Sequence, residues 1–325
     1  MTKHFARILV GLLLVALFLG NCARWVTLPL VERLEAIAYD ARLRLTMPGT
    51  LDPRIVIVDI DERSLQAEGR WPWGRDKLAR LVDQLFDRYQ VAVAGFDIVF
   101  AEPDGSSGLA QLEALAAGEL SGNAAFESAL RELRSRLAFD ELLAARLRDR
   151  PVVLGYYFSN AGGAEGGASL TVGRLPDPVL AAGTFSGRNI RFTRWSGHGA
   201  NLPALQAAAA SAGHFNQLTD TDGVARRVPM LAEFNGAYYE SLSLAVVRLL
   251  LGSPGIEPGE PAEAVLSRGY SGLEWLNVGP LRLPVDELVT SYVPYRGPRG
   301  SFTYVSATDE LAGRVEPQKL EKRVV

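Results

Sequence analysis

Three aspartates that lie in two short apolar segments of the 325-residue chain could share one chemistry. Asp59 and Asp61 close the run RIVIVDID, and Asp97 lies in VAVAGFDIVF. Carboxylate oxygens are the ligands that Mg and Ca ions prefer, and converging acids relieve their repulsion by binding such a cation. The three side chains are therefore candidate metal ligands. In the alternative interpretation, Asp61 or Glu62 caps a turn, while Arg70 and Arg75 neutralise the remaining charge.

A tryptophan-rich turn follows the first pair of aspartates, in the sequence RWPWGR. Trp71 and Trp73 flank one proline and could form an aromatic shelf beside a ligand, with Arg75 at its edge. Because tryptophan is highly buried on average, the same residues could instead make a rigid turn over the core. The candidate ligand-binding residues are Asp59, Asp61, Trp73, Arg75 and Asp97.

The elements that must position these residues follow from the apolar pattern. The β-branched run at 55–60 does not alternate, which predicts a strand covered on both faces in a parallel sheet. Apolar residues then recur at helical spacing over 75–89, and a second buried strand is predicted at 92–99. A strand–helix–strand unit of this length is right-handed, and its two strands run the same way. The three aspartates should then meet at the carboxyl edge of neighbouring strands, where open α/β sheets bind ligands.

The rest of the chain adds helices and further strands. Residues 123–148 predict a long helix, PVVLGYYF a third strand, and DTDG a turn between antiparallel strands. TDTDG also resembles the start of a calcium loop, but the twelfth position counted from Asp220 is Leu231 instead of an acid. We predict an α/β domain with a mostly parallel sheet, flanking helices and an antiparallel hairpin addition, preceded by one N-terminal membrane helix.

The N-terminal segment is apolar enough to enter a membrane. Residues 8–20 carry no charge, and Lys3, His4 and Arg7 precede them. A bilayer core of about 30 Å needs about 20 helical residues, which this stretch reaches if its flanks take part. Positive charge before the span favours a cytoplasmic N-terminus. We interpret the segment as an uncleaved anchor, although a cleaved signal peptide would share most of these features.

These features divide the chain into a cytoplasmic tail at 1–4, a transmembrane helix at 5–23, a membrane-proximal helix at 24–46 and an extracytoplasmic domain at 47–325. The membrane-proximal helix could pack on the domain or pair with its copy in a second chain. The closing LEKRVV begins a strand and stops, which indicates a domain truncated at its C-terminal strand.

Composition and charge exclude several classes of function. The chain has 34 basic and 37 acidic residues and a net charge of −3, which gives no electrostatic basis for nucleic-acid binding. One cysteine excludes an intrachain disulfide, and three scattered histidines form no zinc-binding cluster. The sequence also lacks the internal repeats expected of a structural or adhesion module.

Several short motifs, taken in order along the chain, resemble one known family. They are YDARLRL, IVIVDIDERSL, GRWPWGRDKLARLVDQL, VAVAGFDIVFAEPD, GHFN with DTDGVARRVPML, SLSLAVVRLLLG, and YRGP with FTYVSATDELAG. From about residue 39 onward the chain resembles the type-two CHASE domain, whose name abbreviates cyclases/histidine kinases-associated sensory extracellular domain.

The resemblance implies a function in signalling. In that family the domain follows one membrane helix and usually precedes three more and a cytoplasmic module, such as an adenylate cyclase, a diguanylate cyclase or a kinase. It implies a periplasmic or other extracytoplasmic sensor in the cell membrane, which detects an unknown small molecule or protein and works as a homodimer. On this interpretation the 325-residue chain itself is not an enzyme. Mg or Ca is its only candidate cofactor.

One alternative function uses the same carboxylates. An extracytoplasmic metal-dependent hydrolase could hold its ion with Asp59, Asp61 and Asp97. The sequence offers neither a Ser/His/Asp order nor a metal-binding histidine pair nor a glycine-rich phosphate loop in support. The sensor is therefore the preferred hypothesis.

Overall fold

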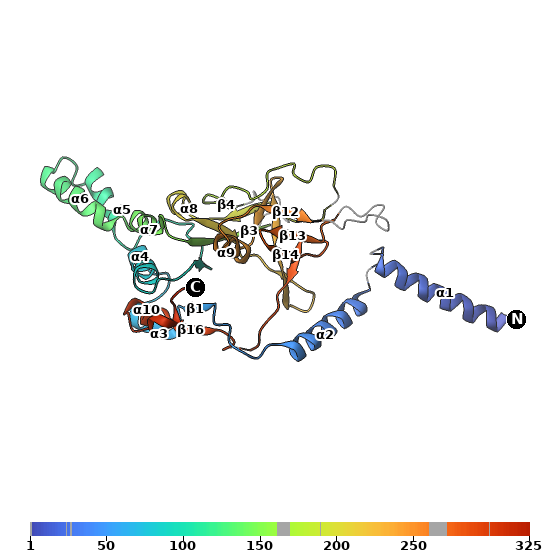
Figure 1. Ribbon diagram of the computed structural model, residues 1–325. Helices are drawn as coiled ribbons and strands as arrows, with labels where there is room; N and C mark the ends of the chain where they lie inside the picture. The colour runs from blue at the N-terminus through green and yellow to red at the C-terminus, as the bar shows by residue number, and fades with distance from the viewer. Residues whose placement is uncertain are drawn as a thin grey trace. The chain divides into compact units, whose positions relative to one another are not determined.

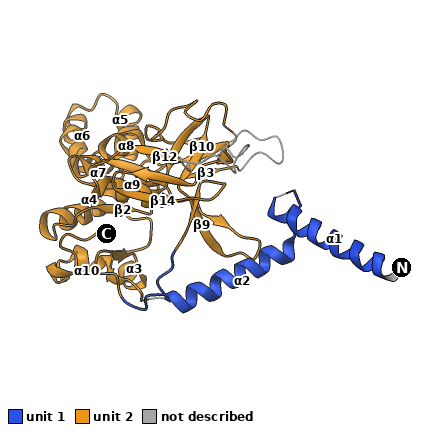
Figure 2. Cartoon of the chain, turned by 45° about the vertical axis from the view of Figure 1, so that its right-hand side comes forward, with its two compact units in different colours: residues 1–50, 294–298 blue, residues 51–293, 299–325 orange. Residues whose placement is uncertain are grey.

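The structure is a computed structural model that describes residues 2–23, 25–26, 28–160, 170–188, 190–259, 272–298 and 300–325. The chain divides into two compact units, which Figure 2 colours separately. Unit 1 comprises Met1–Thr50 and Pro294–Pro298, and unit 2 comprises Leu51–Val293 and Arg299–Val325. Unit 2 mixes helices with parallel and antiparallel strands, which confirms the predicted α/β class (Figure 1).

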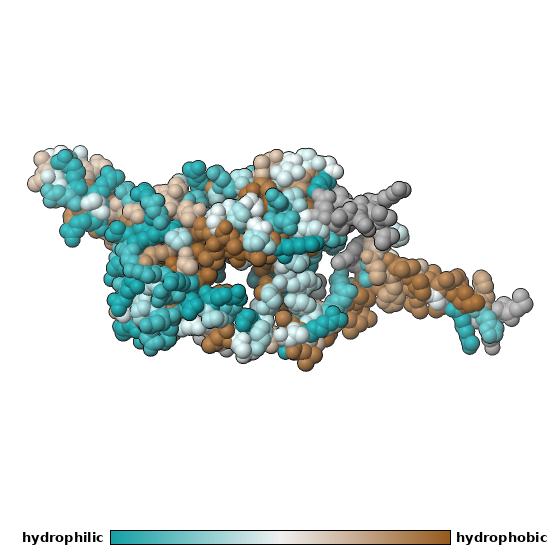
Figure 3. All heavy atoms as spheres, viewed as in Figure 1, coloured by the Kyte–Doolittle hydropathy of each residue, from teal (hydrophilic) through white to brown (hydrophobic). Residues whose placement is uncertain are grey.

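Unit 1 consists mainly of two helices. Helix α1, Thr2–Cys22, carries exposed apolar side chains, and Figure 3 shows it brown along most of its length. Its segment His4–Cys22, 19 residues, is the one helix in the described part of the chain that is long and apolar enough to cross a membrane. Helix α2, Pro29–Thr46, begins with a proline, which suits a first turn because that N–H has no helical partner. None of its 18 residues, all of them described, is buried.

The centre of unit 2 is a parallel sheet made from strands β1 Val56–Asp59, β2 Ala94–Phe96, β3 Val152–Ser159, β7 Ser211–His214 and β16 Thr303–Ser306. Strand β3 pairs in parallel with β2 and with β7. Strand β1 pairs in parallel with β16. The strands predicted at 55–60 and 92–99 and the third strand PVVLGYYF are therefore confirmed.

The end of the chain joins these strand pairs into one sheet. Val324 forms parallel bridges with Ile55, beside β1, and with Val93, beside β2. The amide of Val56 donates to the Val324 carbonyl at 2.9 Å, and the amide of Gly95 donates to the carbonyl of Val325 at 2.7 Å. The prediction that β1 and β2 are neighbours is wrong, because the closing residues lie between them.

Helices cover both faces of the sheet: α4 Arg75–Asp83, α7 Phe139–Leu147, α8 Pro203–Ala208 and α9 Leu242–Leu250. In β3, Val152 and Leu154 belong to the main core with α4, α7 and α8, whereas Val153 belongs to a small cluster with α9. Successive strand residues point to opposite faces, so α9 covers the face opposite the other three helices. Helix α4 continues as a π-helical turn, Gln84–Arg88, which confirms the helix predicted at 75–89.

The single helix predicted at 123–148 is wrong, because the segment forms two helices. Helix α6, Ala124–Leu137, ends at Ala138, whose φ of −79° and ψ of 72° are not helical, and α7 begins directly after it. Helix α6 buries no residue, whereas α7 buries Leu143 and Leu147 in the core. The break lets α7 follow the core while α6 pairs with α5, Leu109–Ala117, away from it (Figure 1).

The rest of unit 2 is mostly antiparallel and contains the predicted DTDG hairpin. Its strands are β5 Thr193–Trp195, β6 Gly197–Gly199, β8 Leu218–Thr219, β9 Ala225–Pro229, β10 Leu231–Phe234, β11 Ala237–Glu240, β12 Ile256–Gly259, β13 Trp275–Val278, β14 Leu281–Pro284 and β15 Thr290–Tyr292. The DTDG turn joins β8 to β9, and Gly223 adopts the left-handed region there with φ of 83°. The short strand β4, Thr171–Val172, pairs in parallel with β6, which is antiparallel to β3.

Candidate functional site

Asp61 holds the start of a short helix. It is the N-cap of α3, Glu62–Glu68, and accepts hydrogen bonds from the Ser64 amide at 2.8 Å and the Ser64 hydroxyl at 2.7 Å. The hydroxyl of Ser306, at the end of β16, donates to the same Asp61 oxygen at 2.8 Å. Burial raises the pKa of Asp61, but these hydrogen bonds outweigh it and hold that pKa below its usual value. The interpretation of Asp61 as a cap is confirmed.

A pocket of about 580 Å³ lies beside this cap, and we call it the polar pocket. Its lining residues are Asp59, Asp61, Arg63, Gly300, Thr303, Tyr304, Val305, Ser306, Asp309, Arg314, Val315, Glu316 and Lys319. Most of its charges already have partners. Asp309, on α10 Ala307–Leu311, accepts from Arg63 at 2.7 Å and from Arg314 at 2.8 Å. Lys319 lies 3.5 Å from Glu316.

A second pocket of about 770 Å³ lies at the carboxyl ends of β1, β2 and β7, and we call it the apolar pocket. Its lining residues are Ile60, Leu65, Trp71, Pro72, Arg75, Asp97, Ile98, Val99, Phe100, Ala101, Glu102 and Phe215. Ile60 directly follows β1, residues 97–102 follow β2, and Phe215 follows β7. Ligand pockets of about 300–1,000 Å³ with mostly apolar walls and few polar groups are the common kind in proteins.

Arg75 is the wall residue that fixes the geometry of the apolar pocket. Its backbone amide, at the start of α4, donates to Asp104 at 2.5 Å. Its buried guanidinium lies 4.6 Å from the ring centroid of Phe100 and donates to the Glu102 carbonyl at 3.3 Å. Its Nε lies 3.5 Å from the Asp140 carboxylate of α7. Arg75 therefore ties α4 to the loop after β2 and is already neutralised by Asp140.

The two tryptophans of RWPWGR have different surroundings. Trp73 is 3% exposed, and its Nε1 donates to the Gly69 carbonyl at 2.9 Å. Trp71 is 39% exposed and lines the apolar pocket, with its ring centroid 6.1 Å from that of Trp73. Trp73 is thus a core residue of the turn, and the tryptophan that lines the apolar pocket is Trp71.

The structure does not bring the three candidate aspartates together. Asp59 and Asp61 line the polar pocket, while Asp97 lines the apolar pocket with Arg75. The chain's closing residues pair with Ile55 and with Val93, beside the starts of β1 and β2, so these two strands are not neighbours. Among the described residues, no group of three or more His, Cys, Asp and Glu side chains could hold a metal ion. Ligand binding by any of the named residues stays a prediction.

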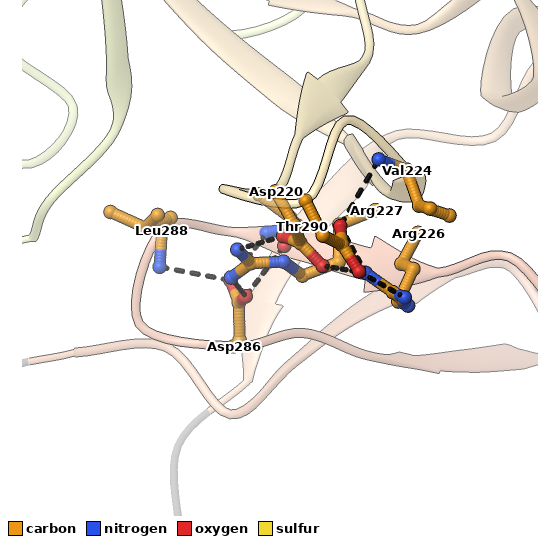
Figure 4. Close-up of polar contacts among 8 residues, drawn as sticks. Asp220, Val224, Arg226, Arg227, Asp286, Leu288 and Thr290 are labelled. Carbon is orange, nitrogen blue, oxygen red and sulfur yellow. Dashed lines mark hydrogen bonds and ion pairs between the residues drawn. The ribbon is translucent and has the colours of Figure 1, made fainter. Parts of the chain in front are cut away.

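The carboxylates of the TDTDG turn pair with arginines (Figure 4). Asp220 accepts from Arg226 at 2.9 Å and from Arg227 at 2.9 Å. Arg226 also pairs with Asp222 at 2.8 Å, and Arg227 pairs with Asp286 at 3.2 Å. The hydrogen bond from Arg226 lowers the pKa of Asp222 to about 2. The residues ARR that follow DTDG were the sequence signal for this network, which joins the hairpin to the segment before β15.

The sequence-based prediction missed several buried titratable side chains, among them Glu310, His214 and Glu240. Glu310 on α10 is fully buried, neither of its oxygens has a hydrogen bond within the described chain, and burial raises its pKa to about 9. His214 on β7 is equally buried, and burial lowers its pKa to about 3. Burial raises the pKa of Glu240 to about 7, although Arg248 pairs with it at 2.5 Å. No local pattern marks these residues as buried.

The comparisons with curated proteins and with solved structures each returned no match. The model of the CHASE2 domain family matches residues 9–325, which is nearly the whole chain. CHASE2 domains are sensory extracellular domains of signalling receptors, and their role is not catalytic. The protein is a member of the CHASE2 domain family.

Proposed function

We propose that this chain is the extracytoplasmic sensory part of a membrane receptor, and that a ligand in the apolar pocket regulates a cytoplasmic nucleotide cyclase, such as an adenylate cyclase, or a kinase. The family match over residues 9–325 supports the sensory role. The single observation that carries the location of the site is the apolar pocket at the carboxyl ends of β1, β2 and β7. Open α/β sheets bind their ligands at this edge.

The proposed topology puts unit 2 outside the cytoplasm. The uncharged residues 8–20 of α1 follow Lys3, His4 and Arg7, and positive charge before such a stretch favours a cytoplasmic N-terminus. Residues 24–325 would then lie outside, in the periplasm of a bacterium with two membranes. Alkaline phosphatase fused after Val325 of the chain given should be active, and β-galactosidase at the same point should be inactive. The reverse pattern would contradict the topology.

A ligand can regulate a distant output only if it binds one arrangement of the receptor better than another. We propose that this difference is transmitted in a homodimer through α2. Helix α2 exposes Leu30, Leu34, Ile37 and Leu45, which recur at the spacing of one helix face. At about 1.5 Å per residue, its length gives about 27 Å of surface for a second copy.

Cysteine cross-linking tests the dimer. In a Cys22→Ser background, Ile37→Cys should cross-link in membranes, because residue 37 lies on the apolar face. Glu35→Cys is the control, since two residues along a helix place a side chain on nearly the opposite face. Equal cross-linking at both positions would contradict pairing through this face.

Filling the pocket tests the sensory function in the full-length receptor. Ala101→Trp places an indole among the apolar wall residues, so it should hold the output at one level whatever the growth medium contains. Ala110→Trp, on the exposed surface of α5, is the control and should keep the regulation of the parent. A crystal structure of the variant should show that the indole fills the pocket. If the pocket is filled and the Ala101→Trp receptor is still regulated normally, the proposed site is wrong.

A further inference from the structure

We propose that the apolar pocket takes an organic cation, a ligand with a hydrophobic body and an ammonium group at the pocket mouth. The proposal rests on the sensory function of this pocket and adds the chemical class of its ligand. Three observations lead to it: the apolar walls, two carboxylates that have no partner among the described residues, and an exposed tryptophan.

The walls determine the body of the ligand. Eight of the lining side chains are hydrocarbon or aromatic and at least partly exposed, and they are Ile60, Leu65, Trp71, Pro72, Ile98, Val99, Ala101 and Phe215. Apolar area of this kind favours a ligand that removes it from water, and each buried CH₂ of the ligand contributes to affinity. A sugar or an inorganic ion would leave this surface wet.

Two carboxylates determine the charge. Asp97 and Glu102 both line the pocket and are both exposed. Neither carboxylate makes a hydrogen bond or an ion pair with any part of the chain that the structure describes. The other charged lining residue is Arg75, whose guanidinium is already occupied by Asp140, the Glu102 carbonyl and the ring of Phe100. The charged groups of this pocket that remain available to a ligand are therefore negative.

The exposed aromatic side chain provides a second attraction for a cation. Trp71 lines the pocket and is 39% exposed, so part of its indole ring is accessible to a ligand. Tryptophan is the best aromatic partner for cations. An anionic ligand would instead meet two carboxylates, and a neutral ligand would gain from neither feature. A cation–π contact and one or two partly exposed ion pairs together predict a preference of about tenfold or more for the cation.

Three probes of equal size and different charge test the proposal. Phenylbutylammonium, phenylbutanol and phenylbutyrate are titrated at pH 7 into the full chain in lipid nanodiscs, with empty nanodiscs as the reference for partitioning into lipid. Isothermal calorimetry should give a Kd for the ammonium about tenfold lower than for the alcohol. Phenylbutyrate should bind the most weakly of the three.

Variants without the two carboxylates test whether Asp97 and Glu102, which we call the rim carboxylates, cause the preference for the ammonium probe. In the double variant Asp97→Asn with Glu102→Gln, the ammonium should bind no better than the alcohol. The control double variant, Glu132→Gln with Asp149→Asn, removes two exposed carboxylates elsewhere and should retain the preference. Thermal melts should show that both proteins are folded.

Three results would overturn the proposal: tighter binding of phenylbutyrate, a preference for the ammonium that survives in the rim variant, or no binding of any probe. None of these results contradicts the proposed sensory function, because that function is tested separately with the Ala101→Trp receptor. If that receptor is regulated normally while the ammonium binds, the sensory site is wrong and the cation site stands.

Discussion

The polar pocket and the apolar pocket both include residues at the carboxyl end of β1, and they differ in whether their carboxylates have partners. In the polar pocket Asp61 accepts three hydrogen bonds, and Asp309 pairs with two arginines. In the apolar pocket the exposed carboxylates of Asp97 and Glu102 make no such bonds with the described chain. The carboxylates of Asp61 and Asp309 therefore stabilise the fold, whereas those of Asp97 and Glu102 are available to a ligand.

This difference shows why acidic residues at strand ends cannot be interpreted as one group. Asp61 and Asp97 follow two parallel strands of one sheet, yet one caps a helix and the other is exposed beside apolar walls. Replacing a side chain that already has partners in the fold should lower the free energy of unfolding. Replacing a side chain that contacts only a ligand should lower the affinity for that ligand and leave the free energy of unfolding nearly unchanged.

The largest expected effect separates the two tryptophans near the apolar pocket. Trp73→Ala should lower the free energy of unfolding by about 3–5 kcal/mol, because it empties a buried site and removes the bond to the Gly69 carbonyl. Trp71→Ala should cost less than about 1 kcal/mol, because its ring is 39% exposed. Urea unfolding of the full chain in detergent measures both. Equal losses would show that Trp71 is also part of the core.

The next effect concerns pH and compares two adjacent residues of α10. Asp309 pairs with arginines, whereas Glu310 is buried without a hydrogen bond in the described chain. The pKa of Glu310 rises from 4.5 to about 9 on folding. Its stabilising contribution is therefore complete below about pH 4.5 and is lost as pH rises toward 9.

Glu310→Gln should remove this loss, because glutamine has no proton to release. The unfolding free energy of the variant should fall less steeply than that of the parent between pH 5 and about 9. Glu316→Gln, at an exposed position of the polar pocket, should keep the slope of the parent. Parallel curves for the parent and the Glu310 variant would show that Glu310 is solvated or paired.

A smaller effect is expected for the helix cap of the polar pocket. Asp61→Ala should cost about 1–2 kcal/mol, because α3 loses its N-cap and two serine hydroxyls lose their acceptor. The depressed pKa of Asp61 means that its contribution is present near neutral pH and is lost as pH falls through that pKa. Asp59→Ala is the matched change in the same pocket and should cost less. A larger loss for Asp59 would contradict the assignment of the cap.

Local periodicity was sufficient to predict the strand–helix–strand unit and the DTDG hairpin, because neighbours in sequence determine both. The separation of Asp59 from Asp97 could not be predicted in this way. It depends on Val324, which enters the sheet from more than 200 residues further along the chain. Pairing between such distant segments leaves no periodic signal near either strand.

The surroundings of single side chains were also beyond local pattern. Trp71 and Trp73 are chemically identical and flank the same proline, so only their packing against the rest of the fold decides which is buried. Glu310 gave no signal because its burial follows from how α10 packs on α3 and α4. Arg75 was predicted at the pocket and lies there, but its partner Asp140 comes from α7.

The smallest expected effect tests whether the rim carboxylates are free of the fold. Asp97→Asn and Glu102→Gln should each change the unfolding free energy by less than about 0.5 kcal/mol, because neither side chain has an ion pair to lose within the described chain. Asp309→Asn in the polar pocket removes the negative charge that pairs with two arginines and should cost about 1 kcal/mol. Urea unfolding at low ionic strength gives the clearest contrast, since salt screens exposed pairs. A rim variant that loses as much stability as Asp309→Asn would mean that its carboxylate has a structural partner. The distinction between the two pockets would then fail at that residue.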